Sequence, residues 1–173
     1  MLSIFPSVKW GARGRFSDQE VTSICFDSRK LEKDCIFVAI RGTKVDGHAF
    51  LTEAVAKGAI ALVVEDASRV PSAFEGAVAV VSDTRVALNQ LAARYFAFPA
   101  EKLFAVGVTG TNGKTTITHM IEAILNKAGK PTGVIGTIDH HLGTKVWPAE
   151  LTTPDPLSFQ KRLKEFVDLG AKA

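Results

Sequence analysis

The clearest chemistry in this sequence lies between Gly107 and Thr116, which read Gly-Val-Thr-Gly-Thr-Asn-Gly-Lys-Thr-Thr. Glycines allow a backbone to approach an anion closely and to adopt positive φ angles. Backbone N–H groups at the start of a following helix, together with the helix dipole, favour negative charge at that point. In such a loop Lys114 would reach the β- and γ-phosphates, and the Thr115 hydroxyl would bind Mg²⁺. The spacing therefore predicts a phosphate-binding loop.

The segments around this loop are those that such a loop requires. The apolar run 103–106 precedes it and predicts a strand, and a helical pattern follows it. The apolar residues of that pattern fall on one helix face: Ile117, Met120, Ile121, Ile124, Leu125 and Ala128. The general motif has a glycine where this sequence has Val108, so the match is incomplete. The alternative is an ordinary strand-to-helix turn with a surface lysine, but the succession of strand, loop and helix favours the phosphate-binding loop.

The composition narrows the class of protein and partner. The chain has 173 residues, enough for one domain or two small ones, and its 46% hydrophobic and 23% charged residues are typical of a soluble globular protein. A net charge of +3, without a basic cluster among aromatic residues, argues against a nucleic-acid partner. No apolar run is long enough to span a membrane, and the apolar N-terminus lacks the basic start of a signal peptide. We therefore expect a cytoplasmic protein with neither a nucleic-acid nor a membrane partner.

The cysteines and histidines do not predict a metal site. Cys25 and Cys35 lie in apolar, strand-like runs, so we expect buried thiols in a reducing compartment. His140 and His141 follow Asp139, but no cysteine or further carboxylate cluster supports a metal site there. We expect that histidine pair to lie in a solvated turn.

Strands and helices alternate through the first part of the chain. Strands are predicted at 21–26, 36–40, 59–64 and 78–81, and helices after the loop at 41–48 and after Asp83. Residues 10–15 are interpreted as a loop. This alternation predicts an α/β fold with a largely parallel sheet. The proline at 99 breaks the pattern, so we place a small α/β domain at 1–98 and a second domain at 99–173.

The second domain begins with the phosphate-binding loop and its helix. Strands are predicted at 132–138 and 144–147, and a further helix after Asp155 has Phe159, Leu163, Phe166 and Val167 on one face. That helix should lead into another strand, so we expect the segment to be the opening part of a larger ATP-binding domain. An unpaired sheet edge and an uncovered helix face would favour self-association through residues 103–173.

Several motifs together resemble the Mur ligase family. The sequences Asp-Ser-Arg at 27–29, Ile-Phe-Val-Ala-Ile-Arg-Gly at 36–42 and Asp-Gly-His-Ala-Phe at 46–50 resemble the N-terminal domain of these enzymes. The loop at 110–116 resembles their ATP loop. The sequences Gly-Thr-Ile at 136–138 and Thr-Thr-Pro-Asp at 152–155 resemble the E-type members, which add the third peptide residue to the peptidoglycan precursor.

The resemblance implies an ATP- and Mg²⁺-dependent amide ligase. ATP would phosphorylate a carboxylate of UDP-N-acetylmuramoyl-L-alanyl-D-glutamate, and the amine of diaminopimelate or lysine would attack the acyl phosphate. Lys114 and the loop amides would stabilise charge on the transferring phosphoryl group. The ATP-binding residues implied are Gly110, Thr111, Asn112, Gly113, Lys114, Thr115 and Thr116.

The resemblance also implies contacts for the UDP-sugar substrate and for magnesium. Phe26 and Ser28 would contact the uridine nucleotide, and a second contact would come from the loop residues Thr43, Lys44 and Val45. The muramoyl peptide would be held by Thr152 and Thr153. Mg²⁺ would be bound by Thr115 and Glu150. Each has a simpler explanation. Ser28 is a common turn residue, Lys44 could be a solvated charge, and the threonine pair could be extended loop.

Members of the family normally have three domains, and the chain lacks the C-terminal domain that binds the incoming amino acid. We therefore expect the 173-residue chain alone to be inactive. The alternatives are a free-standing UDP-sugar- or nucleotide-binding module without ligase activity, an F-type Mur ligase, or a folylpolyglutamate synthase. Asp-Ser-Arg at 27–29 argues against the folate enzyme, and Thr-Thr-Pro-Asp at 152–155 argues against the F type.

Overall fold

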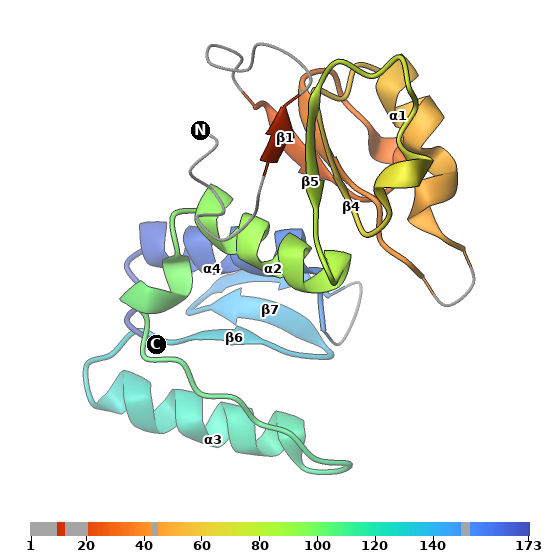
Figure 1. The fold of residues 1–173 in the computed structure, drawn as a ribbon. Coiled ribbons are helices and arrows are strands. Elements are labelled where there is room, and N and C mark those ends of the chain that lie inside the picture. Colours follow the sequence, from red (N-terminus) through yellow and green to blue (C-terminus); the bar gives the residue numbers. More distant parts are fainter. Residues whose placement is uncertain (1–9, 13–20, 43–44, 150–152) are drawn as a thin grey trace. The chain divides into compact units, whose positions relative to one another are not determined.

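The computed structural model describes residues 10–12, 21–42, 45–149 and 153–173 (Figure 1). The chain divides into two compact units, residues 1–91 and 92–173. Each unit is described by itself below. The domain boundary expected at residues 98 and 99 stays a prediction.

The first unit is built on a five-stranded sheet with the order β1-β5-β4-β3-β2. Its strands are β1 (Trp10–Ala12), β2 (Ser23–Cys25), β3 (Cys35–Val38), β4 (Ala61–Val64) and β5 (Ala77–Val80). Neighbours from β2 to β5 are parallel, and β1 is antiparallel to β5. The predicted parallel sheet is confirmed. The predicted loop at 10–15 is wrong for β1, because a three-residue strand is too short to show a periodic pattern.

The apolar runs of the first unit form its core. All four residues of β3 and of β4 are buried, as expected of strands covered on both faces. Phe37, Leu51 and Leu62 belong to one hydrophobic cluster in this core. Cys25 and Cys35 are both buried free thiols, as predicted, and burial raises the pKa of Cys35 to about 11.

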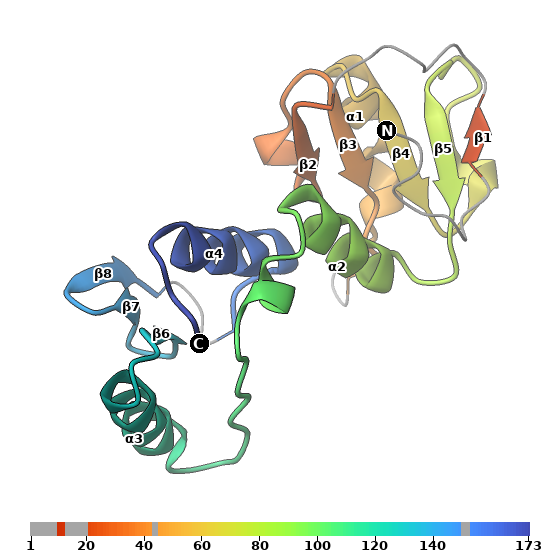
Figure 2. The same cartoon turned by 90° about the vertical axis from the view of Figure 1, so that its left-hand side faces the viewer.

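Short helices connect these strands. A 3₁₀ turn, Gly47–Phe50, leads into α1 (Leu51–Ala56), which lies against one face of the sheet in Figure 2. Gly58, with a φ of 91°, follows the end of α1. Asp83 caps α2 (Thr84–Tyr95), because its Oδ1 accepts hydrogen bonds from the N–H groups of Arg85 at 2.7 Å and Val86 at 3.0 Å. The predicted cap is therefore confirmed.

The second unit combines helices with an antiparallel sheet of order β6-β7-β8. Its elements are the 3₁₀ turn Pro99–Lys102, α3 (Lys114–Lys127), β6 (Gly133–Ile135), β7 (Asp139–Leu142), β8 (Lys145–Pro148) and α4 (Pro156–Asp168). The predicted solvated turn at 139–141 is wrong. His140 is buried in β7, opposite Ile135 on β6 and Trp147 on β8. Cross-strand pairing thus outweighs the polar character of the local sequence.

The predicted strand at 103–106 is also wrong. This segment is extended but carries no strand, and Phe104 N–H donates a single hydrogen bond, to the Lys172 carbonyl, at 2.9 Å. Lys172 N–H in turn donates to the Pro131 carbonyl at 2.8 Å. Residues 172–173 pair further with residues 131–133, but among the described residues 103–106 form no second bond of this kind, and a strand requires a ladder of such bonds.

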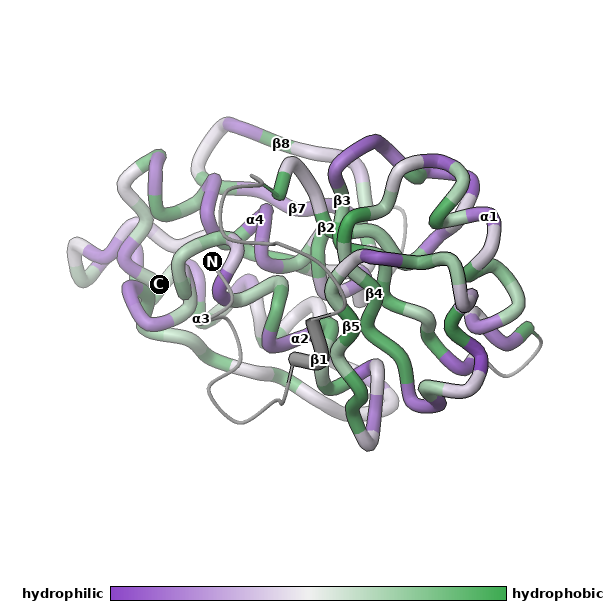
Figure 3. The backbone as a smooth tube through the Cα atoms, turned by 45° about the horizontal axis from the view of Figure 1, so that its top comes forward, coloured by the Kyte–Doolittle hydropathy of each residue, from purple (hydrophilic) through white to green (hydrophobic). Residues whose placement is uncertain are grey.

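Hydrophobic residues are distributed differently in the two units. Figure 3 shows hydrophobic residues gathered along β4 and β5. In the second unit, by contrast, large apolar side chains of α3 are exposed, including Met120 and Ile124. Among the described residues, no helix is long and apolar enough to cross a membrane.

Candidate functional site

The loop that precedes α3 has the backbone that its glycines were expected to allow. Gly113 is the N-terminal cap of α3 with a φ of 77°, and Gly110 has a φ of 149°. Positive angles of this kind favour glycine. Gly113 has no side chain with which to cap α3, so the first N–H groups of the helix stay available to an anion.

Lys114 is held above this loop by the loop's own carbonyl groups. Its ammonium donates hydrogen bonds to the Gly110 oxygen at 2.6 Å and to the Thr111 oxygen at 3.3 Å. Oxygens of a phosphate would serve as acceptors in place of these carbonyls. Thr115 follows Lys114 on the first turn of α3 and is exposed. The donor set of ammonium, backbone N–H and hydroxyl groups fits a nucleotide phosphate with Mg²⁺.

An open cavity of about 710 Å³ lies within the second unit beside this loop. Gly110, Lys114 and Thr115 line it, and Thr153 lines the same cavity. The structure therefore brings one residue of the predicted threonine pair to the cavity that the phosphate-binding loop also lines. The volume lies within the range of small-molecule sites. Glu150 and Thr152 lie outside the described residues.

The expected substrate residues of the first unit lie at one edge of its sheet. Phe26 and Ser28 follow β2, and Val45 lies in the connection that follows β3. Because β2 and β3 are parallel neighbours, both connections leave from the carboxyl ends of the strands, where open α/β sheets bind ligands. Val45 is exposed, whereas Thr43 and Lys44 lie outside the described residues.

Ser28 has structural partners of its own. It is buried, and its carbonyl accepts a hydrogen bond from Lys57 Nζ at 2.8 Å. The turn that contains it is fixed by Asp27, whose carboxylate binds Arg29 at 2.7 Å. The hydrogen bond from the Arg29 side chain is the main reason that the pKa of Asp27 is lowered to about 2. Asp27 therefore stays ionised, and the turn keeps its shape, at neutral pH.

A polar network at the same sheet edge escaped the sequence analysis. His48 donates from Nδ1 to Asp46 Oδ1 at 2.7 Å and accepts at Nε2 from the Glu65 N–H at 3.0 Å. Glu65 Oε1 accepts from the N–H of Thr84 at 3.0 Å and from its hydroxyl at 2.8 Å. These hydrogen bonds, the backbone one foremost, lower the pKa of Glu65.

The network ties together the connections after β3, β4 and β5. Arg41 extends it, with its Nε 3.7 Å from the second oxygen of Glu65. It therefore holds the two ends of the loop that contains the expected substrate residues 43–45. The sequence signal that could have revealed it is Glu65, a carboxylate directly after a buried strand.

Two family models match this chain, and both describe Mur ligases. The model of the Mur ligase family catalytic domain matches residues 20–96, and the model of the Mur ligase middle domain matches residues 108–173. The second match begins within the predicted phosphate-binding loop and includes most of the residues that line the cavity beside it. The chain belongs to the Mur ligase family.

Curated relatives narrow the similarity to one member of that family. The chain is 47% identical over 156 residues to the UDP-N-acetylmuramoyl-L-alanyl-D-glutamate–2,6-diaminopimelate ligase of Aquifex aeolicus (strain VF5). The aligned region covers 89% of this chain and 31% of that protein. The chain is 40% identical over 172 residues to the ligase of the same name from Geobacillus thermodenitrificans (strain NG80-2), covering 99% of this chain and 34% of the relative. The chain thus spans about a third of the length of these relatives.

The comparison with solved structures also ranks a diaminopimelate ligase above a MurF ligase. A structure of a UDP-N-acetylmuramoyl-L-alanyl-D-glutamate–2,6-diaminopimelate ligase matches with a TM-score of 0.70 at 26% identity, over 91% of this chain and 32% of that one. The MurF ligase of Thermotoga maritima, solved in complex with ADP, matches with a TM-score of 0.52 at 25% identity, over 84% of this chain and 30% of that one. The similarity is therefore greater to the diaminopimelate ligase.

Proposed function

We propose that this chain provides the UDP-substrate-binding and ATP-binding parts of a ligase that joins diaminopimelate to UDP-N-acetylmuramoyl-L-alanyl-D-glutamate. The observation that carries the proposal is the 47% identity, over 89% of the chain, to a ligase named for that reaction. The geometry of the phosphate-binding loop supports it, because a ligase of this kind has to bind ATP. Diaminopimelate replaces the earlier choice between diaminopimelate and lysine, since the relatives carry that name.

The second unit would bind the nucleotide. ATP with Mg²⁺, when bound, supplies the phosphoryl group that activates a substrate carboxylate. The loop Gly110–Thr116 surrounds the phosphates in this proposal, and Lys114 neutralises their charge as it turns from the loop carbonyls. Thr115 provides a hydroxyl for the metal, and Glu150 is the further proposed metal ligand. Neutralising charge in this way favours transfer without requiring a protein nucleophile.

The first unit would bind the uridine end of the substrate. Phe26, Ser28 and the loop 43–45 share the carboxyl edge of the sheet, and the network around Glu65 orders the two ends of that loop. Ser28 is buried in the turn that Asp27 fixes, and it would contact the ligand from that turn. Thr152 and Thr153 would hold the muramoyl-peptide part beside the nucleotide.

A chimera tests this proposal directly. The region of the Aquifex aeolicus ligase that aligns with this chain is replaced by the present sequence, and formation of the tripeptide product is measured. We expect turnover, and a loss of about 100-fold or more in the Lys114→Ala chimera. Lys127→Ala is the matched control, since Lys127 is an exposed lysine at the last position of α3, and it should keep the activity.

Two results would contradict the proposal. One is a folded chimera that binds the UDP-sugar but forms no amide, which would favour the free-standing binding module. The other is a Lys114→Ala chimera with near-normal turnover, which would remove the phosphate-binding role of the loop.

A further inference from the structure

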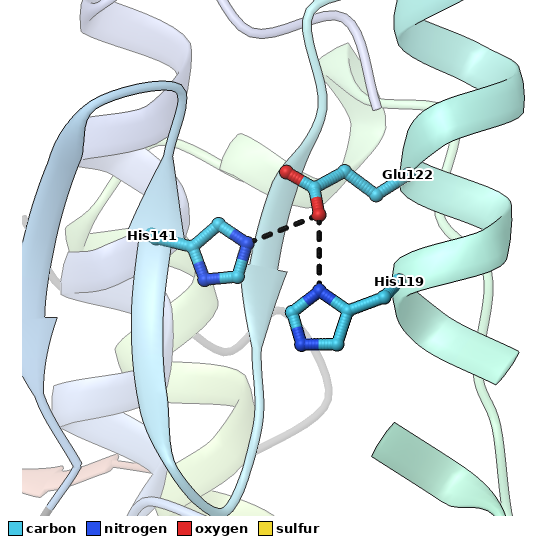
Figure 4. Close-up of side chains that lie close together, drawn as sticks. All are labelled: His119, Glu122 and His141. Atoms are coloured by element: carbon cyan, nitrogen blue, oxygen red, sulfur yellow. Dashed lines mark hydrogen bonds and ion pairs between the residues drawn. The ribbon is translucent and has the colours of Figure 1, made fainter. Parts of the chain in front are cut away.

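Three side chains with metal-binding atoms converge in the second unit, and two of them, His119 and His141, line the same cavity as the phosphate-binding loop. His119 and Glu122 lie one turn apart on α3, and His141 lies on β7 (Figure 4). Their ligand atoms all lie within 4.8 Å of one another. His141 and Glu122 are largely buried, and His119 is half exposed at 51% of its side-chain surface.

The distances within this cluster match the edges of a small coordination polyhedron. Glu122 Oε2 lies 3.3 Å from His119 Nδ1 and 3.1 Å from His141 Nε2. Bonds of about 2.0–2.1 Å to a tetrahedral zinc ion place neighbouring ligand atoms about 3.3 Å apart. An ion could therefore be bound with small side-chain movements.

A fourth residue orients one of the two imidazoles. Asp139 Oδ1 lies 2.6 Å from His141 Nδ1 and would keep the proton on that nitrogen, so that Nε2, which lies 3.1 Å from Glu122 Oε2, could bind an ion. Ligating histidines characteristically have such a carboxylate on the other ring nitrogen. The rings of His119 and His141 are stacked at 5.4 Å with an interplanar angle of 8°, and both contact Glu122 Oε2.

We propose that His119, Glu122 and His141 form a binding site for a transition-metal ion of the zinc class, with Asp139 as an outer-shell partner. Two imidazole nitrogens and one carboxylate suit zinc and its neighbours, whereas magnesium prefers oxygen ligands. The exposure of His119 leaves room for water as a fourth ligand. The site is thus distinct in chemistry from the magnesium site expected at Thr115.

A metal ion bound at this site would help to hold α3 in place. His119 lies one helical turn after Thr115 on α3, and His141 belongs to the sheet. A bound ion would link the helix that presents the phosphate-binding loop to β7. Because α3 has no fully buried residue of its own, that link would add to the few contacts that fix it.

Zinc chloride titrated into the complete 173-residue chain tests the proposal. Calorimetry should show one ion bound per chain, with a rise in the thermal unfolding temperature. His119→Ala and Glu122→Gln should each weaken binding by about 10-fold or more, and Asp139→Asn by a similar or smaller factor. Met120→Ala, an exposed neighbour on α3, is the matched control and should leave binding unchanged.

His119→Ala is the decisive variant, since a half-exposed side chain can be removed without loss of the fold. Thr115→Ala separates this site from the phosphate-binding loop and should also bind zinc normally. The proposal is overturned if the native chain binds no zinc. It is equally overturned if His119→Ala binds as tightly as the native chain, or if Thr115→Ala alone abolishes binding. In those cases the cluster is an ordinary hydrogen-bonded group.

Discussion

Two apolar segments of similar sequence have different structures in the two units. Residues 35–38 form a central strand of the first unit, paired on one side with β2 and on the other with β4. Residues 103–106 precede the phosphate-binding loop but form only one backbone hydrogen bond to a neighbouring segment. Phe37 is fully buried, whereas Phe104 is 56% exposed. An apolar segment therefore forms a strand only where neighbouring strands are present to pair with it.

Core truncation should show this difference most strongly. Phe37→Ala removes a fully buried ring and should lower the free energy of unfolding by about 3–5 kcal/mol. Phe104→Ala, the matched change at the exposed position, should cost about 0.5 kcal/mol or less. Urea unfolding followed by circular dichroism measures both. Equal losses would contradict the contrast between the two segments.

A glycine substitution tests whether the second unit is nonetheless well packed near α4. A Cβ at Gly133 would lie 2.3 Å from the ring of Phe166, which is buried. Gly133→Ala should therefore destabilise the chain by about 1–3 kcal/mol. A Cβ at Gly107 meets no atom within 4 Å, so Gly107→Ala is the control for thermal unfolding. If both variants unfolded alike, the packing of β6 against α4 would be in doubt.

The polar network of the first unit should contribute less than its core. Glu65→Ala leaves the buried Thr84 hydroxyl and N–H without their acceptor, and should cost about 1–2 kcal/mol. Glu53→Ala removes a solvent-exposed ion pair with Lys57 and should cost less. Denaturant titration of the two variants distinguishes these effects, and a larger loss for Glu53→Ala would contradict the role given to Glu65.

The smallest expected effect is on stability in acid, and it concerns the turn that Asp27 fixes in the first unit. The pKa of Asp27 is lowered from 3.8 to about 2 by Arg29, so its contribution to stability is complete above about pH 4. That contribution is lost as the pH falls from about 4 to about 2, because the carboxylate becomes protonated. Asp27→Asn should be less stable at neutral pH and lose less stability over that interval. Parallel acid-unfolding curves for the two proteins would show that Asp27 contributes nothing there.

The buried strands and the backbone of the glycine loop before α3 were predictable because their signals are local. That this loop binds phosphate stays a prediction. Four apolar runs gave four parallel strands, and Asp83 caps its helix as predicted. The loop geometry followed from the glycines at 110 and 113. Local sequence is sufficient where a run is buried on both faces or where a glycine needs a positive φ.

Two missed features depend on partners distant in the sequence, whereas the strand at 139–142 was missed for a local reason, because its residues are polar and its partners β6 and β8 lie close to it in the sequence. β1 exists because it pairs with β5. The hydrogen bond from Thr84 to Glu65 likewise joins residues 19 positions apart. No local pattern contains these contacts. Self-association through residues 103–173 stays a prediction, supported by exposed apolar residues such as Met120 and Ile124.

The most direct test of the account is a calorimetric titration of this chain with UDP-N-acetylmuramoyl-L-alanyl-D-glutamate. We expect binding of this substrate that Ser28→Ala weakens and Lys114→Ala leaves intact. The reason is that the uridine end is assigned to the first unit and the phosphate-binding loop belongs to the second. The thermal stability of Ser28→Ala is measured in parallel, since Ser28 is buried. Absence of binding, or binding lost in Lys114→Ala but kept in a folded Ser28→Ala, would contradict that assignment.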